Sequence, residues 1–105
     1  MSGQSFHDCI TACEACAKEC ISCADQCKGH SEMVLCESLC RACADICLRC
    51  ADECRLGTIS DATIQACADA CRKCAEACEQ HDNDHCRDCA EECRICEEAC
   101  NSVLV

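Results

Sequence analysis

Residues 9–27 read CITACEACAKECISCADQC, a segment in which cysteine returns at every third or fourth position. The gaps alternate between three and four residues, and this mean spacing of about 3.5 residues keeps one stripe of an α-helix facing a partner helix. A β-strand would need a period of two. The intervening residues are mostly good helix formers such as Ala, Glu, Asp and Lys. The segment therefore predicts a helix with one face of thiols.

Three further groups of cysteines repeat this pattern, and every gap inside a group is again three or four residues. The four groups consist of Cys9, Cys13, Cys16, Cys20, Cys23 and Cys27; Cys36, Cys40, Cys43, Cys47, Cys50 and Cys54; Cys67, Cys71, Cys74 and Cys78; and Cys86, Cys89, Cys93, Cys96 and Cys100. Each group predicts one helix. The four helices are expected over residues 5–28, 31–56, 59–80 and 83–103.

Residues that form turns and helix caps separate the four groups. Gly29 and Ser31 mark the first connection, and Ser31 is expected to cap the second helix. Gly57 ends that helix, Ser60 or the nearby Thr58 starts the third, and the polar residues 81–84 precede the fourth. Such short connections require antiparallel neighbours. The predicted fold class is all-α, an antiparallel up-down-up-down four-helix bundle with a cysteine-lined core, formed by residues 1–105 as a single domain.

The composition excludes several classes of partner. The formal net charge is −11 and Phe6 is the sole aromatic residue, so the chain offers neither a basic patch nor stacking platforms for nucleic acid. It also contains no apolar run of about 18 residues, the length needed to cross a membrane. Residues 1–5 lack the features of a secretion signal. We therefore expect a cytoplasmic protein without nucleic-acid or membrane partners.

The 21 cysteines favour metal binding over disulfides. Their number is odd, no export signal is visible, and the chain has three glycines and no proline, unlike loop-rich disulfide scaffolds. Side chains three or four residues apart on a helix have Cβ atoms about 5–6 Å apart, whereas a disulfide needs about 3.5–4.5 Å. A core built for stability alone would use Leu, Ile and Val in place of cysteine. A thiol redox protein remains a less favoured alternative, because redox CxxC motifs normally occur once, beside a sheet.

Soft thiolate ligands favour Cu(I), Zn(II) or iron–sulfur clusters. Zinc sites normally use four ligands arranged as two short pairs, and a continuous stripe of equivalent sulfurs suggests no such division. Cu(I) accepts two or three thiolates that bridge neighbouring ions, so loading can approach one Cu(I) per cysteine. The preferred interpretation is a copper-storing protein and not an enzyme. A zinc or general thiophilic-metal buffer is the alternative.

The two ends of the predicted bundle differ in chemistry. Antiparallel helices bring together, at one end, the candidate ligands His30, Met33, His81 and His85. The opposite end carries the apolar residues Phe6, Ile64 and Val103. We therefore expect Cu(I) to enter and leave through a mouth lined by histidine and methionine. His7 lies at the apolar end and is assigned no role.

The unit CxxCA occurs six times, for example at 13–17, 40–44 and 86–90. Through this motif the whole chain resembles the bacterial copper storage proteins, which are cysteine-rich four-helix bundles. The histidines at the mouth and the missing export signal resemble the cytosolic branch of that family. The resemblance implies homotetramers of bundles that receive Cu(I) from donor proteins and pass it to acceptors.

Overall fold

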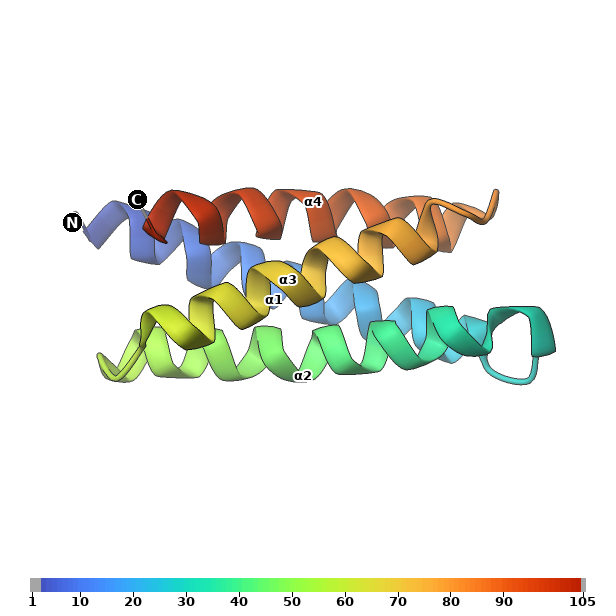
Figure 1. Ribbon diagram of the computed structural model, residues 1–105, viewed down its shortest axis with the longest axis horizontal. Helices are drawn as coiled ribbons and strands as arrows, with labels where there is room; N and C mark the ends of the chain where they lie inside the picture. Colours follow the sequence, from blue (N-terminus) through green and yellow to red (C-terminus); the bar gives the residue numbers. More distant parts are fainter. Residues whose placement is uncertain (1–2, 105) are drawn as a thin grey trace.

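The computed structural model describes residues 3–104, with side chains described from Phe6 onward. Its elements, in chain order, are α1 (Gly3–Cys27), the short 3-10 helix η1 (Ser31–Met33), α2 (Val34–Leu56), α3 (Asp61–Cys78) and α4 (Asp84–Leu104). The helices run up, down, up and down in a rod of 43 × 18 × 18 Å (Figure 1). The predicted fold class is confirmed.

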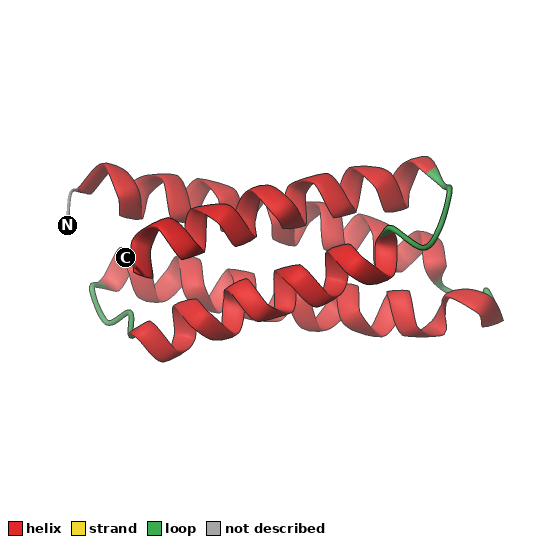
Figure 2. Cartoon of the chain, turned by 45° about the horizontal axis from the view of Figure 1, so that its top comes forward, coloured by secondary structure: helices red, strands yellow, loops and turns green. Residues whose placement is uncertain are grey.

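The connections divide the rod into two distinct ends (Figure 2). The α1–α2 and α3–α4 connections lie together at one end, which we call the mouth. The α2–α3 connection lies at the other, the far end, together with both chain termini. This arrangement follows from short loops between antiparallel helices. None of the helices in the described part of the chain is both long and apolar enough to cross a membrane.

The helix boundaries follow local backbone chemistry. Gly57 ends α2 at φ 75°, where its N–H donates to the Cys54 carbonyl oxygen, and a residue with a Cβ would be strained there. Ser60 caps α3, because its hydroxyl oxygen accepts a hydrogen bond from the Thr63 N–H at 3.2 Å. The predicted cap at Ser31 is wrong. Ser31 begins the 3-10 turn, and α2 starts after Met33 without a side-chain cap.

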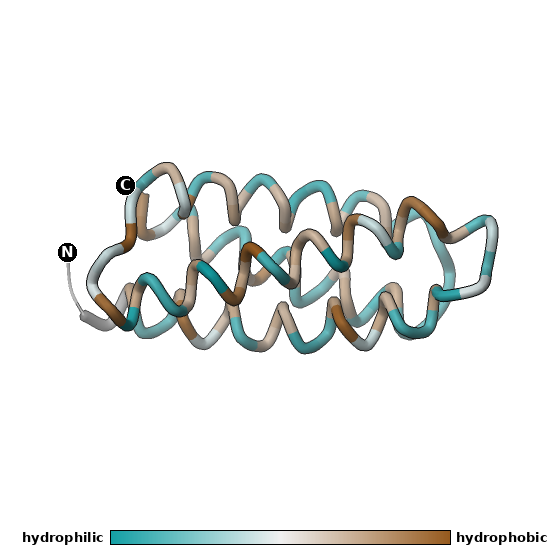
Figure 3. The backbone as a smooth tube through the Cα atoms, turned by 90° about the horizontal axis from the view of Figure 1, so that it is seen from below, coloured by the Kyte–Doolittle hydropathy of each residue, from teal (hydrophilic) through white to brown (hydrophobic). Residues whose placement is uncertain are grey.

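The core consists almost entirely of sulfur and small side chains. Twenty cysteines are buried, while Cys54 at the far end is partly exposed. Their buried neighbours include the alanines Ala17, Ala24, Ala44, Ala51, Ala68, Ala75 and Ala90. Along each helix, apolar residues alternate with hydrophilic ones, as expected for a helix with one buried face (Figure 3). The small alanines let the helices approach closely, so that thiols from different helices meet.

Interhelical ion pairs join helices that are consecutive in the chain. Arg41 pairs with Asp25 at 3.5 Å and Arg55 pairs with Glu14, both between α1 and α2. Arg94 on α4 lies 2.9 Å from Glu79, just beyond the end of α3. These side chains are largely exposed, so each pair contributes little to stability. The ion pairs support two helical hairpins, α1–α2 and α3–α4, and the core thiols make contacts between those hairpins.

Candidate metal centre

The cysteine side chains of all four helices form one connected network along the axis. Between helices, the Sγ atoms of Cys40 and Cys74 lie 3.5 Å apart, and those of Cys16 and Cys93 lie 3.6 Å apart. Within a helix, successive thiols approach similarly, as with Cys9 and Cys13 at 4.0 Å. All 21 cysteines are free thiols at these non-bonded distances. The predicted inward orientation of the sulfur rows is confirmed.

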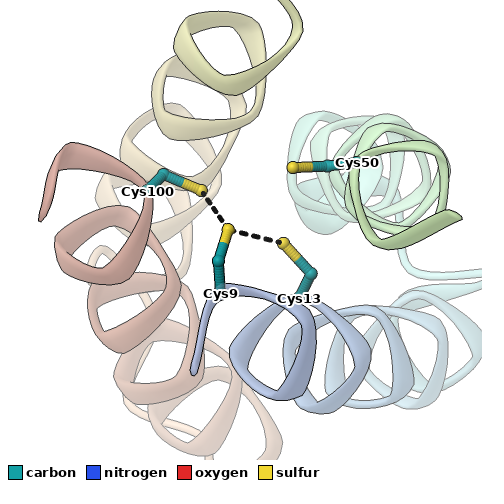
Figure 4. Close-up of side chains that lie close together, drawn as sticks. All are labelled: Cys9, Cys13, Cys50 and Cys100. Carbon is teal, nitrogen blue, oxygen red and sulfur yellow. Dashed lines mark hydrogen bonds between the residues drawn. The ribbon is translucent and has the colours of Figure 1, made fainter. Parts of the chain in front are cut away.

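Several sets of four thiols have all their Sγ atoms within 4.8 Å of one another. Five such sets are Cys9, Cys13, Cys50 and Cys100; Cys13, Cys47, Cys67 and Cys96; Cys16, Cys20, Cys43 and Cys93; Cys16, Cys43, Cys47 and Cys71; and Cys20, Cys74, Cys89 and Cys93. Each set takes thiols from at least three helices and from both hairpins. The first set lies at the far end, where the sulfurs of α1, α2 and α4 point toward a common centre (Figure 4). An ion bound within such a set would join the two hairpins.

These sets correct one step in the sequence reasoning. The thiol stripe was expected to offer no division into four-ligand groups, yet four-thiol groups are present. However, the groups overlap, since six cysteines each belong to two of these five sets, namely Cys13, Cys16, Cys20, Cys43, Cys47 and Cys93. Neighbouring groups therefore cannot each hold an isolated ion with its own four ligands. Ions in adjacent groups would share thiolate ligands, and soft thiolates are ligands that Cu(I) prefers.

Burial and mutual hydrogen bonding control thiol ionisation. Burial raises the pKa of Cys27 to about 12 and, as the largest of several causes, the pKa of Cys86 to about 11. Deeper in the core, neighbouring thiols form hydrogen bonds with one another, and these bonds shift their pKa values. The contact between Cys16 and Cys20 raises the pKa of Cys20 and lowers that of Cys16. A soft cation that enters this network must displace protons, and each Cu⁺ that replaces one H⁺ leaves the net charge of the core unchanged.

At the mouth, His85 is the histidine that reaches the thiol network. Its Nδ1 atom lies 3.3 Å from Cys23 Sγ and 3.6 Å from Cys86 Sγ, and its ring is partly buried. Met33 is 4% exposed, and its Sδ atom accepts a hydrogen bond from the Asn83 side-chain amide at 3.9 Å. A nitrogen ligand and a thioether therefore lie beside the outermost thiols.

The other two predicted mouth residues lie farther out. His30 is exposed, with its Nδ1 atom 3.8 Å from a carboxylate oxygen of Glu32. His81 is half-buried and lines an open surface cavity of about 510 Å³ together with Arg87 and Arg94. The four candidates thus share one end of the bundle, as expected from the topology. Of these four described side chains, the one that forms hydrogen bonds with core thiols is that of His85.

The chain matches the family model of the copper storage protein over residues 2–105. This chain belongs to the copper storage protein family. It is similar to the cytosolic copper storage protein of Streptomyces lividans, solved with five coppers, at 34% identity and a TM-score of 0.88, over 96% of this chain and 92% of that one. As a copper storage protein, it binds multiple Cu(I) ions through its core cysteines and is not an enzyme.

Two further solved structures of copper storage proteins resemble the chain. Apo copper storage protein 3 from Bacillus subtilis is 36% identical, with a TM-score of 0.88, over 94% of this chain and 98% of that one. The Cu(I)-bound copper storage protein BsCsp3 is 34% identical, with a TM-score of 0.90, over 96% and 99%. No curated protein matches the chain.

Sequence reasoning missed one residue at the mouth of this copper storage protein. Asn83 lies in the α3–α4 connection, where its side chain contacts the Met33 sulfur. An amide is not a soft ligand, so a search for Cu(I) ligands passes over it. The available signal was its place directly before a helix, a position that Asn favours as a cap.

The far end of the copper storage protein is closed by apolar side chains. Ile64 of α3 is 2% exposed and Val103 of α4 is 5% exposed, and the partly buried Phe6 packs against the same core. Ile64 occupies the helical position one turn before the first cysteine of α3. The four-thiol set that includes Cys9 and Cys100 is also located at this end. Cys54 is the thiol closest to solvent there, and burial raises its pKa to about 11.

Proposed function

We propose that this copper storage protein holds close to one Cu(I) per cysteine, with thiolates bridging neighbouring ions along the core. The observation that carries the proposal is the overlap of the four-thiol sets, in which one sulfur belongs to two adjacent groups. The proposed metal ligands are the 21 cysteines of the four groups, with His30, Met33, His81 and His85 acting at the mouth. Sharing of sulfurs lets many ions bind without four separate ligands for each.

The charge balance supports a high copper content. An apo core of protonated thiols is neutral, and a buried unpaired charge would be very costly. If each Cu⁺ replaces one thiol proton, the core stays neutral at every stage of filling. Divalent zinc at the same one-to-one ratio would add one positive charge per ion. The core therefore accommodates a long row of monovalent ions better than a long row of divalent ones.

The mouth residues are proposed to act in sequence during uptake. His30 and His81 lie outermost and offer nitrogen ligands from the two connections. His85 stands between them and the core, within 3.3 Å of the Cys23 sulfur. Met33 offers a soft thioether beside the same opening. Weaker nitrogen and thioether ligands at the mouth would let Cu(I) exchange before thiolates hold it more tightly.

Location and assembly are the remaining parts of the proposal. The relative from Streptomyces lividans is a cytosolic copper storage protein, and we infer the same compartment for this chain, as the sequence predicted. We also infer a homotetramer of bundles that exchanges copper with donor and acceptor proteins. Apolar side chains exposed on the outer surface support such an assembly, namely Ile21, Leu35, Leu48 and Ile95.

Zinc storage is the second candidate, because the thiol spacing also suits a tetrahedral ion. Four thiolates at about 2.3 Å from zinc lie roughly 3.8 Å from one another, close to the 3.8 Å between the Cys13 and Cys67 sulfurs. Overlap of the sets limits zinc to a few well-separated ions.

Competition between the two metals separates these candidates. Under anaerobic conditions the reduced protein is offered Zn(II) and chelator-buffered Cu(I) together, and the bound metals are measured after gel filtration. The proposal expects copper to fill the core and to expel zinc already bound. Zinc that stays bound in the presence of excess Cu(I) would overturn it.

A further inference from the structure

The Met33–Asn83 contact connects the two chain segments that form the mouth. Met33 belongs to the short helix between α1 and α2, and Asn83 belongs to the α3–α4 connection. The Asn83 Nδ2 atom donates to Met33 Sδ at 3.9 Å. The two residues are 50 positions apart in the chain, and they belong to different hairpins. The contact therefore joins the hairpins at the mouth.

The surroundings of the two side chains differ in a way that suits a reversible contact. Met33 is 4% exposed, so its sulfur is covered, whereas Asn83 is exposed and can turn its amide toward water. A thioether is a weak hydrogen-bond acceptor. Breaking the contact therefore costs little free energy for the Asn83 amide, which can form a hydrogen bond with water. It also frees the Met33 sulfur, which is a soft ligand.

We propose that Asn83 is a positioning residue that holds the Met33 sulfur while the mouth is empty and gives way when Cu(I) binds that sulfur. The inference rests on the proposed role of Met33 as a ligand at the mouth. Cu(I) binds a thioether more strongly than an amide N–H does, so the ion displaces the amide and loosens the link between the two connections. No covalent bond changes, and the displaced Asn83 amide N–H donates its hydrogen bond to water instead.

The test uses Asn83→Ser and Asn83→Asp, because Ser and Asp also serve well before a helix, but neither can donate an amide N–H to Met33. Asn101→Ala is the control, since Asn101 is exposed on α4 near the far end. In the metal-free proteins, hydrogen exchange at residues 30–34 and 81–84 should be faster in both Asn83 variants than in the wild type and the control. Unchanged exchange in both variants would overturn the proposed link.

Copper kinetics provide the second readout. Transfer of the first Cu(I) equivalent from a coloured chelator complex should be about 2- to 10-fold faster in the Asn83 variants, as expected for loss of one weak hydrogen bond. The final copper content should not change. In a Met33→Leu background, Asn83→Ser should have no further effect on the rate. An equal acceleration in that background would show that Asn83 does not act through Met33.

The same data distinguish two ways in which the proposal could fail. One is failure of the Asn83–Met33 contact, which we call the latch, and the other is failure of the proposed role of Met33 at the mouth. If Met33→Leu alone leaves the rate of copper transfer unchanged, Met33 is not a ligand at the mouth, and both its proposed role there and the inference built on that role are wrong. If Met33→Leu slows transfer but the Asn83 variants match the wild type, the mouth stands and the latch is refuted.

Discussion

The mouth and the far end contain similar thiols but differ in what covers them. At the mouth, the outermost cysteines meet His85, and the covering segments are two polar connections held by a weak side-chain contact. At the far end, the set that includes Cys9 and Cys100 lies beside the buried side chains of Ile64 and Val103. The contrast suits the proposed division of tasks, in which copper enters and leaves through the mouth while apolar packing stabilises the far end.

The largest effect should come from copper itself. Each four-thiol set described above contains thiols from both hairpins, so bound ions would join the two hairpins to each other. A ligand at 1,000 times its dissociation constant stabilises a fold by about 4 kcal/mol per site, and many sites are available. We expect the midpoint of thermal unfolding, followed by circular dichroism, to rise by at least about 20 °C on full loading. An unchanged midpoint would contradict copper binding across the hairpins.

A large effect confined to stability is expected at the far end. Ile64→Ala removes a side chain that is 2% exposed, and such a truncation costs about 2–4 kcal/mol. Met33→Leu at the mouth keeps a similar volume and should cost less than about 1.5 kcal/mol. Urea unfolding of the apo proteins measures both. The copper content of Ile64→Ala, determined below its unfolding temperature, should match that of the wild type, and a large loss of copper would refute the division of tasks.

The converse effect, on rate without loss of stability, is expected for His85→Ala. This variant removes the nitrogen 3.3 Å from the Cys23 sulfur and should slow transfer of the first Cu(I) equivalents by about tenfold, the effect of roughly 1.4 kcal/mol. His7→Ala is the matched control, because His7 is exposed at the far end. Stopped-flow transfer from a chelator measures both. Equal rates in the two variants would remove the distinction between the ends.

The smallest effect concerns pH and should appear at both ends of the apo protein. Burial is the main cause that raises the pKa of Cys27 to about 12 and of Cys54 to about 11. A thiol whose pKa is raised by folding holds its proton more tightly in the folded state. Its contribution is therefore complete below the unfolded value of 9.0 and is lost as pH rises through 11 to 12. The urea midpoint of the reduced apo protein should fall between pH 9 and pH 11, and a rise over that range would contradict the shifts.

The fold was predictable because cysteine spacing is a direct record of helix geometry. Alternating gaps of three and four allow one stripe per helix, and Gly57 and Ser60 mark a boundary with ordinary capping chemistry. The cap at Ser31 was predicted wrongly, because a 3-10 turn precedes α2 and moves its start beyond Met33. A hydrogen bond from the Met33 N–H to the His30 carbonyl oxygen closes that turn at 3.0 Å, and the capping preference of Ser31 does not reveal it.

The candidate site was only partly predictable from the sequence. Topology alone places four candidate ligands at one end, but it does not tell which of them turns inward, and His85 does so while His30 remains exposed. The overlap of thiol sets also depends on the rotation of each helix, since members of one set come from three or four helices. Asn83 escaped notice because its importance comes from a partner 50 residues away.

The most direct test of the account is the copper-to-protein ratio of the fully reduced chain after anaerobic loading with excess Cu(I), measured together with the number of thiols that still react with a thiol reagent. With 21 cysteines, sharing of bridging thiolates predicts about one copper per cysteine and almost no reactive thiols. Saturation at a few copper ions, with most thiols still reactive, would contradict a core filled by Cu(I).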